Sequence, residues 1–204
     1  MTYAIHPGYI ARSNPDAWDD TVLPLDARLA SQREVYEYAR AIASDQGCRR
    51  ILDVGCGSGA KLIHWFPQSE FEVIGVELAP TLAYFRKTYP ERRWISPDQE
   101  APSVDFVICA DVIEHLSDPD QLLDYIARTG AKWIVISTPD RDSLDNYSGP
   151  PRNPCHVREW SMPEFREYIS IHFEVSLQFT SVQKAIEDGG ATQVVLCRMG
   201  EIKP

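Results

Sequence analysis

Three glycines and an acidic residue are spaced as in a nucleotide-binding turn. Asp53-Val54-Gly55-Cys56-Gly57-Ser58-Gly59 lies between an apolar segment and a helical pattern, and Glu77 ends the next apolar segment. Glycines let the backbone approach a ligand closely, and the first turn of a helix offers unpaired N–H groups. A carboxylate at Glu77 can accept hydrogen bonds from both hydroxyls of a ribose. These residues predict a ligand that contains a nucleoside, although a tight turn with positive φ angles would also require such glycines.

A second group of chemical side chains is Asp111-x-x-Glu114-His115, which follows a later apolar segment. At helical spacing these three positions share one face, so all three side chains are expected to point into the same site. Glu114 and His115 are candidate catalytic residues for removing a proton. The alternative is structural, with Asp111 capping a helix and the other two side chains making packing contacts.

The segment 152–161 carries a third group. Histidine side chains ordinarily titrate near neutral pH, so His156 is a candidate general base. Arg152 and Arg158 suit a hydroxylated or anionic substrate. Ser161 and Glu164 have the spacing of a capping box, which predicts that a helix begins here and gives the segment a structural role as well.

The first 30 residues are rich in proline and aromatic residues and show no periodic pattern. We expect an irregular segment that folds over the ligand as a lid, with Tyr9 and Trp18 as the lid residues. A terminus that packs on one edge is the alternative. Residues 31–204 are expected to form the enzymatic domain, which opens with a helix capped by Ser31 and stopped by Gly47.

Apolar segments alternate with helical patterns through most of the chain. Near-continuous runs of valine and isoleucine between helices are typical of a parallel sheet that is covered on both faces. Two final strands without a helix between them predict an antiparallel hairpin. The expected fold is α/β, a doubly wound, Rossmann-like domain with a seven-stranded mixed sheet. The predicted strands are 51–54, 72–76, 93–95, 104–109, 132–137, 173–180 and 192–199.

The composition restricts the possible partners. The 204 residues fit one domain, and their formal net charge of −10 argues against a nucleic-acid partner, which normally leaves a basic surface. No apolar stretch reaches the length that spans a bilayer, and the N-terminus lacks the pattern of a secretory signal. Five scattered cysteines show no metal-ligand spacing. We expect a cytoplasmic protein with free thiols, no membrane partner and an oligomeric state that the sequence leaves open.

The sequence resembles the class I S-adenosylmethionine-dependent methyltransferases over residues 35–200. Leu52–Gly59 is similar to their first motif, segment 104–116 resembles their fourth-strand motif, and the closing hairpin is absent from dinucleotide dehydrogenases. The resemblance implies S-adenosyl-L-methionine as cofactor. It implies these cofactor-binding residues: Asp53, Gly55, Gly57, Gly59, Glu77, Asp98 at the adenine, and Asp111.

Within that class the chain resembles the small-molecule branch of ubiquinone-biosynthesis and sugar or polysaccharide methyltransferases. In the ubiquinone branch an acidic-x-x-Glu-His segment is associated with a divalent ion. Asp111 replaces the more usual Glu and shortens the reach, so no metal ligands are assigned. The expected reaction is O-methylation of a small polar acceptor. The alternatives are an N-methyltransferase of a small amine, a nicotinamide-dependent oxidoreductase and a non-catalytic S-adenosylmethionine-binding module.

Overall fold

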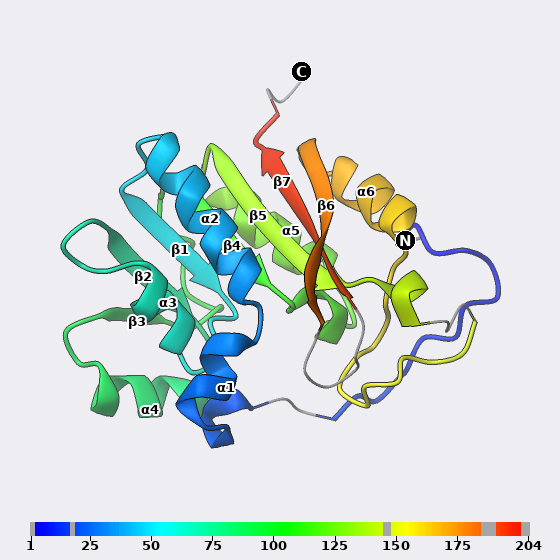
Figure 1. Ribbon diagram of the computed structural model, residues 1–204, viewed down its shortest axis with the longest axis horizontal. Coiled ribbons are helices and arrows are strands. Elements are labelled where there is room, and N and C mark those ends of the chain that lie inside the picture. Colours follow the sequence, from blue (N-terminus) through cyan, green and yellow to red (C-terminus); the bar gives the residue numbers. More distant parts are fainter. Residues whose placement is uncertain (1–2, 17–18, 145–147, 185–190, 201–204) are drawn as a thin grey trace.

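The computed structural model describes residues 3–16, 19–144, 148–184 and 191–200. Their centre is one seven-stranded sheet with the order β3-β2-β1-β4-β5-β7-β6 (Figure 1). Its strands are β1 (Arg50–Val54), β2 (Glu72–Val76), β3 (Arg93–Ile95), β4 (Phe106–Ala110), β5 (Trp133–Pro139), β6 (Glu174–Lys184) and β7 (Ala191–Arg198). The predicted seven-stranded mixed sheet is confirmed.

One strand of the sheet, β7, runs opposite to all the others. The strands β3, β2, β1, β4 and β5 are all parallel, whereas β7 pairs antiparallel with both β5 and β6. The parallel strands therefore all end at one edge of the sheet. The strand order runs outward from β1 through β2 to β3 on one side and from β4 to β5 on the other, so it reverses between β1 and β4. Ligands in open α/β sheets bind at such a reversal, beyond the carboxyl ends of the strands.

Helices cover both faces of the sheet. The main helices are α1 (Leu25–Ala30), α2 (Arg33–Asp45), α3 (Ala60–Trp65), α4 (Ala79–Thr88), α5 (Asp120–Arg128) and α6 (Met162–Ser170). The buried side chains of α2, α3 and α4 form one core cluster with the sheet, and those of α5 and α6 form another. Successive side chains of a strand point to opposite faces of the sheet, so neighbouring residues belong to different clusters. Leu52 packs into the cluster of α5, and its neighbour Ile51 packs into the cluster of α2.

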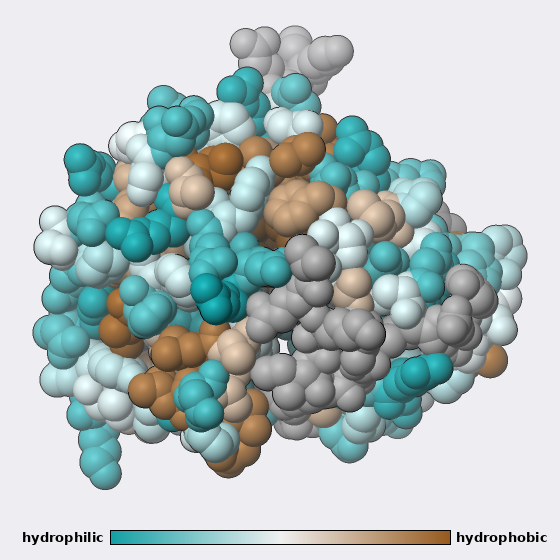
Figure 2. Space-filling model, in the orientation of Figure 1, coloured by the Kyte–Doolittle hydropathy of each residue, from teal (hydrophilic) through white to brown (hydrophobic). Residues whose placement is uncertain are grey.

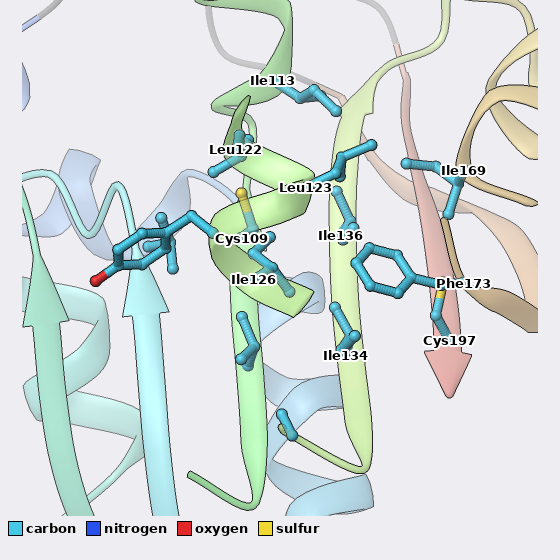
Figure 3. Close-up of a cluster of buried hydrophobic side chains, with 14 of the residues drawn as sticks. Cys109, Ile113, Leu122, Leu123, Ile126, Ile134, Ile136, Ile169, Phe173 and Cys197 are labelled. Atoms are coloured by element: carbon cyan, nitrogen blue, oxygen red, sulfur yellow. The ribbon is translucent and has the colours of Figure 1, made fainter. Parts of the chain in front are cut away.

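The core beneath α5 shows why this helix forms where it does. Leu122, Leu123 and Ile126 project from α5 toward β4 and β5, where they meet Ile134 and Ile136 (Figure 3). Their spacing places them on one helical face, and all five side chains are buried. The packing of this face holds β4 in place beneath the residues that follow it in the chain.

The first 30 residues are more regular than predicted. They contain the short 3₁₀ helix η1 (Asp20–Val22) and helix α1. Ser31 ends α1 instead of capping α2; the N-cap of α2 is Gln32, whose φ is 57°. The prediction for Ser31 was wrong because the turn is held by a distant contact, the hydrogen bond from the Gln32 amide to the carbonyl of Ala110 on β4.

The capping box at the start of α6 is confirmed, with the Ser161 hydroxyl and the Glu164 carboxylate each bound to the other residue's backbone N–H.

On the face shown in Figure 2, hydrophilic side chains dominate and an apolar area lies low in the view, where Figure 1 places α1. Val22 and Leu25 of this N-terminal part are exposed. Within the described ranges, no helix is long and apolar enough to cross a membrane.

Candidate active site

The glycine turn after β1 has the conformation that its sequence predicts. Gly55, Gly57 and Gly59 all have positive φ angles, and Gly59 is the N-cap of α3. A Cβ added at Gly57, where φ is 54°, would lie 2.8 Å from a carboxylate oxygen of Asp20. A side chain at Gly57 is therefore opposed both by the backbone conformation and by a neighbouring segment.

Glu77 follows β2 directly and faces this turn. One carboxylate oxygen accepts a hydrogen bond from the backbone N–H of Gly57 at 3.0 Å, and the other accepts from the N–H of Leu78 at 2.7 Å. Burial raises the pKa of the Glu77 carboxyl. Glu77 thus lies beside the glycine turn at the ends of β1 and β2.

A cavity of about 750 Å³ opens at this edge of the sheet. The glycine turn, Glu77, Asp111 and His115 all contribute to its wall. The charged groups in the wall are mainly acidic: Asp16, Asp19, Asp20, Glu77, Asp111, Asp118 and Asp124 stand against Lys61 and Arg128. The cavity therefore favours a ligand that carries positive charge.

Asp111 reaches the cavity from an unusual backbone conformation. Its φ is 52°, and the 3₁₀ turn η2 begins only at Ile113. The hydroxyl of Ser137, on the neighbouring strand β5, donates to the Asp111 carboxylate at 2.6 Å. Asp111 therefore does not share a helical face with Glu114 and His115, and the expectation of three side chains pointing together into the site is only partly met.

Glu114 lies behind the cavity wall. Its side chain is fully buried, one carboxylate oxygen accepts from the hydroxyl of Thr138 at 3.0 Å, and the other has no hydrogen-bond partner in the described chain. Burial, followed by the charge of Asp111, raises the pKa of Glu114 to about 8.

His115 is the histidine of the cavity wall. Its Nδ1 lies 2.9 Å from the carbonyl oxygen of Cys155, so Nδ1 carries the proton and Nε2 keeps its lone pair. Burial, followed by the charge of His156, lowers the pKa of His115 to about 4. The ring is therefore neutral at physiological pH.

His156 stands against His115, with the two rings edge to face at 4.9 Å. It is buried, outside the residues that line the cavity, and its Nδ1 lies 2.6 Å from a carboxylate oxygen of Glu159. One ligand atom each from Glu114, His115 and His156 lie within 4.8 Å of one another, so these three residues could hold a divalent cation. The sequence spacing did not reveal this grouping, because His156 comes from a distant loop.

The two arginines predicted to bind substrate lie elsewhere. The buried Arg158 guanidinium donates to the carbonyls of Leu116 and Ser117 at 3.0 Å and lies over the ring of Tyr3, with 4.4 Å to its centroid. Arg152 is exposed, and neither arginine lines the cavity. The structure gives Arg158 a role in holding loops together.

The N-terminal segment 3–16, which we call the strap, runs beside the loop after β5 (Figure 1). Backbone hydrogen bonds join Arg12 to Val157 and Asp16 to Pro154, and the Tyr9 hydroxyl accepts from the N–H of Glu159 at 3.0 Å. Pro15 and Asp16, at the end of the strap, line the cavity. Tyr9 is an anchor of the strap and lies outside the cavity wall, while Trp18 lies outside the described residues.

Three predicted cofactor-binding residues lie outside the lining of the cavity: Asp53, Asp98 and Gly59, the N-cap of α3. Asp53 is fully buried beneath the glycine turn, where its carboxylate accepts from the Tyr36 hydroxyl at 2.8 Å. Asp98 is exposed and bonded to the hydroxyl of Ser96, and its neighbour Pro97 lines the cavity instead. Asp53 therefore lies in the core beneath the glycine turn and contacts Tyr36 of α2.

The sequence analysis missed most of the polar residues that line the cavity, among them Lys61, Asp20 and Gln32. Lys61 could have been found, because it is a lysine among the apolar residues at the start of α3, directly after the glycine turn. Asp20 and Gln32 gave no signal, because long-range packing alone brings them to the glycine turn and to β4.

Comparison with known proteins places the chain in a family. Residues 17–180 match the family described as "Methyltransferase domain". A probable S-adenosylmethionine-dependent methyltransferase of Mycobacterium tuberculosis (Rv3030) is 34% identical over 126 residues, which cover 57% of this chain and 45% of that protein. The chain thus spans less than half the length of this relative.

Two further proteins are similar to the chain, one in sequence and one in fold. The small RNA 2'-O-methyltransferase of Arabidopsis thaliana is 26% identical over 214 residues, covering 83% of this chain and 22% of that protein. The fold matches a Burkholderia thailandensis N1-methyltransferase solved with S-adenosylhomocysteine, with a TM-score of 0.62, 19% identity and 94% coverage of each chain.

The site agrees with this family. The glycine turn, the carboxylate of Glu77 and the acidic wall suit a ligand with a ribose and a positive charge. A sulfonium nucleoside has both. The chain therefore belongs to the S-adenosylmethionine-dependent methyltransferases.

Proposed function

We propose that this protein transfers the methyl group of S-adenosylmethionine to a hydroxyl of a small polar molecule. One observation carries the proposal: a single cavity joins the glycine turn and Glu77 to Asp111 and His115. The cofactor-binding elements and the candidate acid–base residues thus meet in one space. Methyl transfer is an in-line displacement, which mainly requires that the two reactants be held close and aligned.

The residues that would hold the cofactor are those of the glycine turn and Glu77, with the ribose at the Glu77 carboxylate. When bound there, S-adenosylmethionine supplies an electrophilic methyl group on a positively charged sulfur. The acidic wall of the cavity attracts that charge before reaction. The neutral product S-adenosylhomocysteine loses this attraction, which favours its release.

His115 is our candidate for receiving the acceptor. Its Nδ1 proton is fixed by the Cys155 carbonyl, so Nε2 can accept a hydrogen bond from a hydroxyl. His156 packs against the His115 ring and is tied to Glu159, so its role is to position His115. With a pKa near 4, His115 is a weak base that orients the hydroxyl well but assists its deprotonation modestly.

A divalent cation at Glu114, His115 and His156 would change this balance, since a metal ion lowers the pKa of a bound hydroxyl. The orphaned oxygen of the buried Glu114 carboxylate fits such an ion. Assays with and without EDTA, and with added Mg²⁺ or Mn²⁺, therefore belong in every test of activity.

The 2'-hydroxyl of RNA is the second candidate acceptor. The relative from Arabidopsis, whose name gives this activity, is similar over 83% of the chain. The net charge of −10 argues against it, because RNA binding normally uses a basic surface. The strap and the loop 148–160 also border the cavity, which favours a small acceptor.

The test uses cofactor labelled in its methyl group and three sets of acceptors: hydroxylated metabolites, small amines and short RNAs. We expect label in an O-methyl ether of a small molecule, identified by mass spectrometry. Label on nitrogen or on RNA would overturn the proposed acceptor class. His115→Ala should lower turnover by about 10-fold, the value of the orienting hydrogen bond that it removes, while cofactor affinity is kept. The exposed His64, changed to Ala, is the matched control and should leave turnover unchanged.

A further inference from the structure

Asp20 and Lys61 form a buried pair of opposite charges in the cavity wall. The side chains are each 8% exposed, and the Lys61 Nζ lies 3.8 Å from an oxygen of Asp20. That distance is too long for a hydrogen bond. Neither residue belongs to the motifs by which the sequence was assigned to its family. Burying two charges is costly unless they are paired and hydrogen-bonded, so this loose pair calls for an explanation.

Asp20 is only half satisfied. One carboxylate oxygen accepts from the Ser58 hydroxyl at 3.2 Å, while the other is buried without a hydrogen-bond partner in the described chain. This unpartnered oxygen is the one that lies against Gly57 of the glycine turn. It is therefore available to a positively charged group placed over the turn.

Lys61 is equally open to a ligand. Its ammonium group makes no hydrogen bond within the described residues, and its contacts there are the distant Asp20 carboxylate and the ring of Tyr36, 5.8 Å to the centroid. An ammonium group has three donors, so Lys61 retains the capacity to bind an anion.

The order of the strands indicates which part of the cofactor would lie beside Asp20 and Lys61. Arg128, the other cation of the wall, lies over the ring of Tyr125, 5.7 Å from its centroid. Burial raises the pKa of Tyr125, and the charges of Arg128 and of Arg93 on β3 oppose this effect, so Arg128 lies toward the β3 edge. Glu77 follows β2, Lys61 follows β1, and His115 follows β4. With the ribose at Glu77 and the methyl group directed to His115, the amino-acid end of the cofactor lies on the Lys61 side.

We propose that Asp20 and Lys61 recognise the amino-acid head of S-adenosylmethionine, with Asp20 binding its ammonium group and Lys61 its carboxylate. The head is a zwitterion, so it can enter between the two side chains and leave the net charge of the site unchanged. It then supplies the hydrogen bonds that the pair lacks. In a wall dominated by acidic groups, the ligand carboxylate needs a cation close by. The inference rests on the adenosylmethionine dependence and not on the choice of acceptor.

The test compares ligands that lack one charged group. Isothermal titration calorimetry would measure binding of S-adenosylhomocysteine, its decarboxylated analogue, its deaminated analogue and 5'-methylthioadenosine. For the unchanged protein, loss of either group should weaken binding by about 10- to 100-fold, the usual value of a charge-assisted hydrogen bond. Lys61→Met should bind S-adenosylhomocysteine as weakly as the decarboxylated analogue, while its affinity for that analogue changes by less than about threefold. Asp20→Asn should behave in the same way toward the deaminated analogue.

Several controls separate this role from a structural one. Lys61→Arg keeps the charge and should restore much of the preference for a ligand carboxylate. The exposed Lys87, changed to Met, should alter nothing. Glu77→Gln should weaken all four ligands, because all contain the ribose. The ratio between two ligands for one variant does not depend on how much of that variant is folded.

The outcomes are distinct. If Lys61→Met weakens every ligand equally, or weakens none, Lys61 is only a counterion for its buried carboxylates and the inference is wrong. If the unchanged, folded protein binds none of the four ligands, the adenosylmethionine dependence itself fails.

Discussion

Replacement of Asp53 by asparagine tests the electrostatics beneath the glycine turn. Asp53 is fully buried, and burial raises the pKa of its carboxyl to about 7, against an ordinary value of 3.8. The hydrogen bond from Tyr36 and the charge of Lys61 act in the opposite direction but do not offset this effect. Asparagine has nearly the same shape and can accept the same hydrogen bond, but it cannot ionise.

The sign follows from the two pKa values. Because the pKa is raised in the folded state, the contribution of Asp53 to stability is fully present below about pH 4 and is lost as the pH rises to about 7. The difference of about three pKa units corresponds to about 4 kcal/mol at 1.36 kcal/mol per unit. Between about pH 4.5 and pH 8, the stability of the variant should rise relative to the original protein by about 3 kcal/mol.

Urea unfolding of the ligand-free protein and of Asp53→Asn, followed by circular dichroism at several pH values, gives this difference directly. Other titrating groups act on both proteins and cancel in the comparison. A difference in unfolding free energy that stays constant from about pH 4.5 to pH 8 would refute the reasoning. It would mean that Asp53 ionises normally because Lys61 compensates its burial.

The remaining predictions concern the core and the strap. Leu123→Ala removes a fully buried side chain from the core under α5 and should cost about 2–5 kcal/mol in urea unfolding, whereas the same change at the exposed Leu177 should cost far less. Tyr9→Phe removes the acceptor for the Glu159 N–H and should cost about 1 kcal/mol. It should also make the first 16 residues more sensitive to limited proteolysis. Unchanged proteolysis would mean that the other contacts of the strap hold it without Tyr9.

The strap gives the N-terminal segment a structural role that bears on function. Two contacts fasten it to the loop before α6, from the Glu159 N–H to the Tyr9 hydroxyl and from the indole N–H of Trp160 to the Tyr3 carbonyl. A third joins it to the first turn of α6, from the His6 N–H to the Glu164 carboxylate. The chain then continues to Asp20 on the glycine turn. One segment therefore borders both the cofactor end and the acceptor end of the cavity, and we propose that it is the lid.

Local signals made the architecture predictable. The glycine turn, Glu77 at the end of β2, the runs of valine and isoleucine in β4 and β5, and the capping box of α6 each depend on residues close together in the chain. Backbone conformation and strand burial follow from such short-range patterns. The sheet order and the position of the cavity then follow from the rules that govern parallel α/β folds.

The acid–base group was only partly predictable. Its residues were identified, but their arrangement was assumed to be helical, whereas Asp111 has a positive φ and a bond to Ser137 on β5. His156 was taken as a base exposed to the substrate, yet it is buried behind His115. Nothing in the spacing of a loop 40 residues away indicates which of two histidines faces the cavity.

The sequence by itself determined the fold, the family and the positions of the glycine turn and Glu77, which we propose hold the nucleoside, because these depend on backbone geometry and on residues at fixed positions after strands. Only the tertiary structure decided which charges meet around the glycine turn. In the folded chain, Asp20 of the N-terminal segment lies against Gly57, and Lys61 lies beside Asp20. Arg158 lies away from the cavity and donates to backbone carbonyl groups. These pairings join segments that are far apart in the chain, and their energies depend on burial, which exists only once the chain has folded.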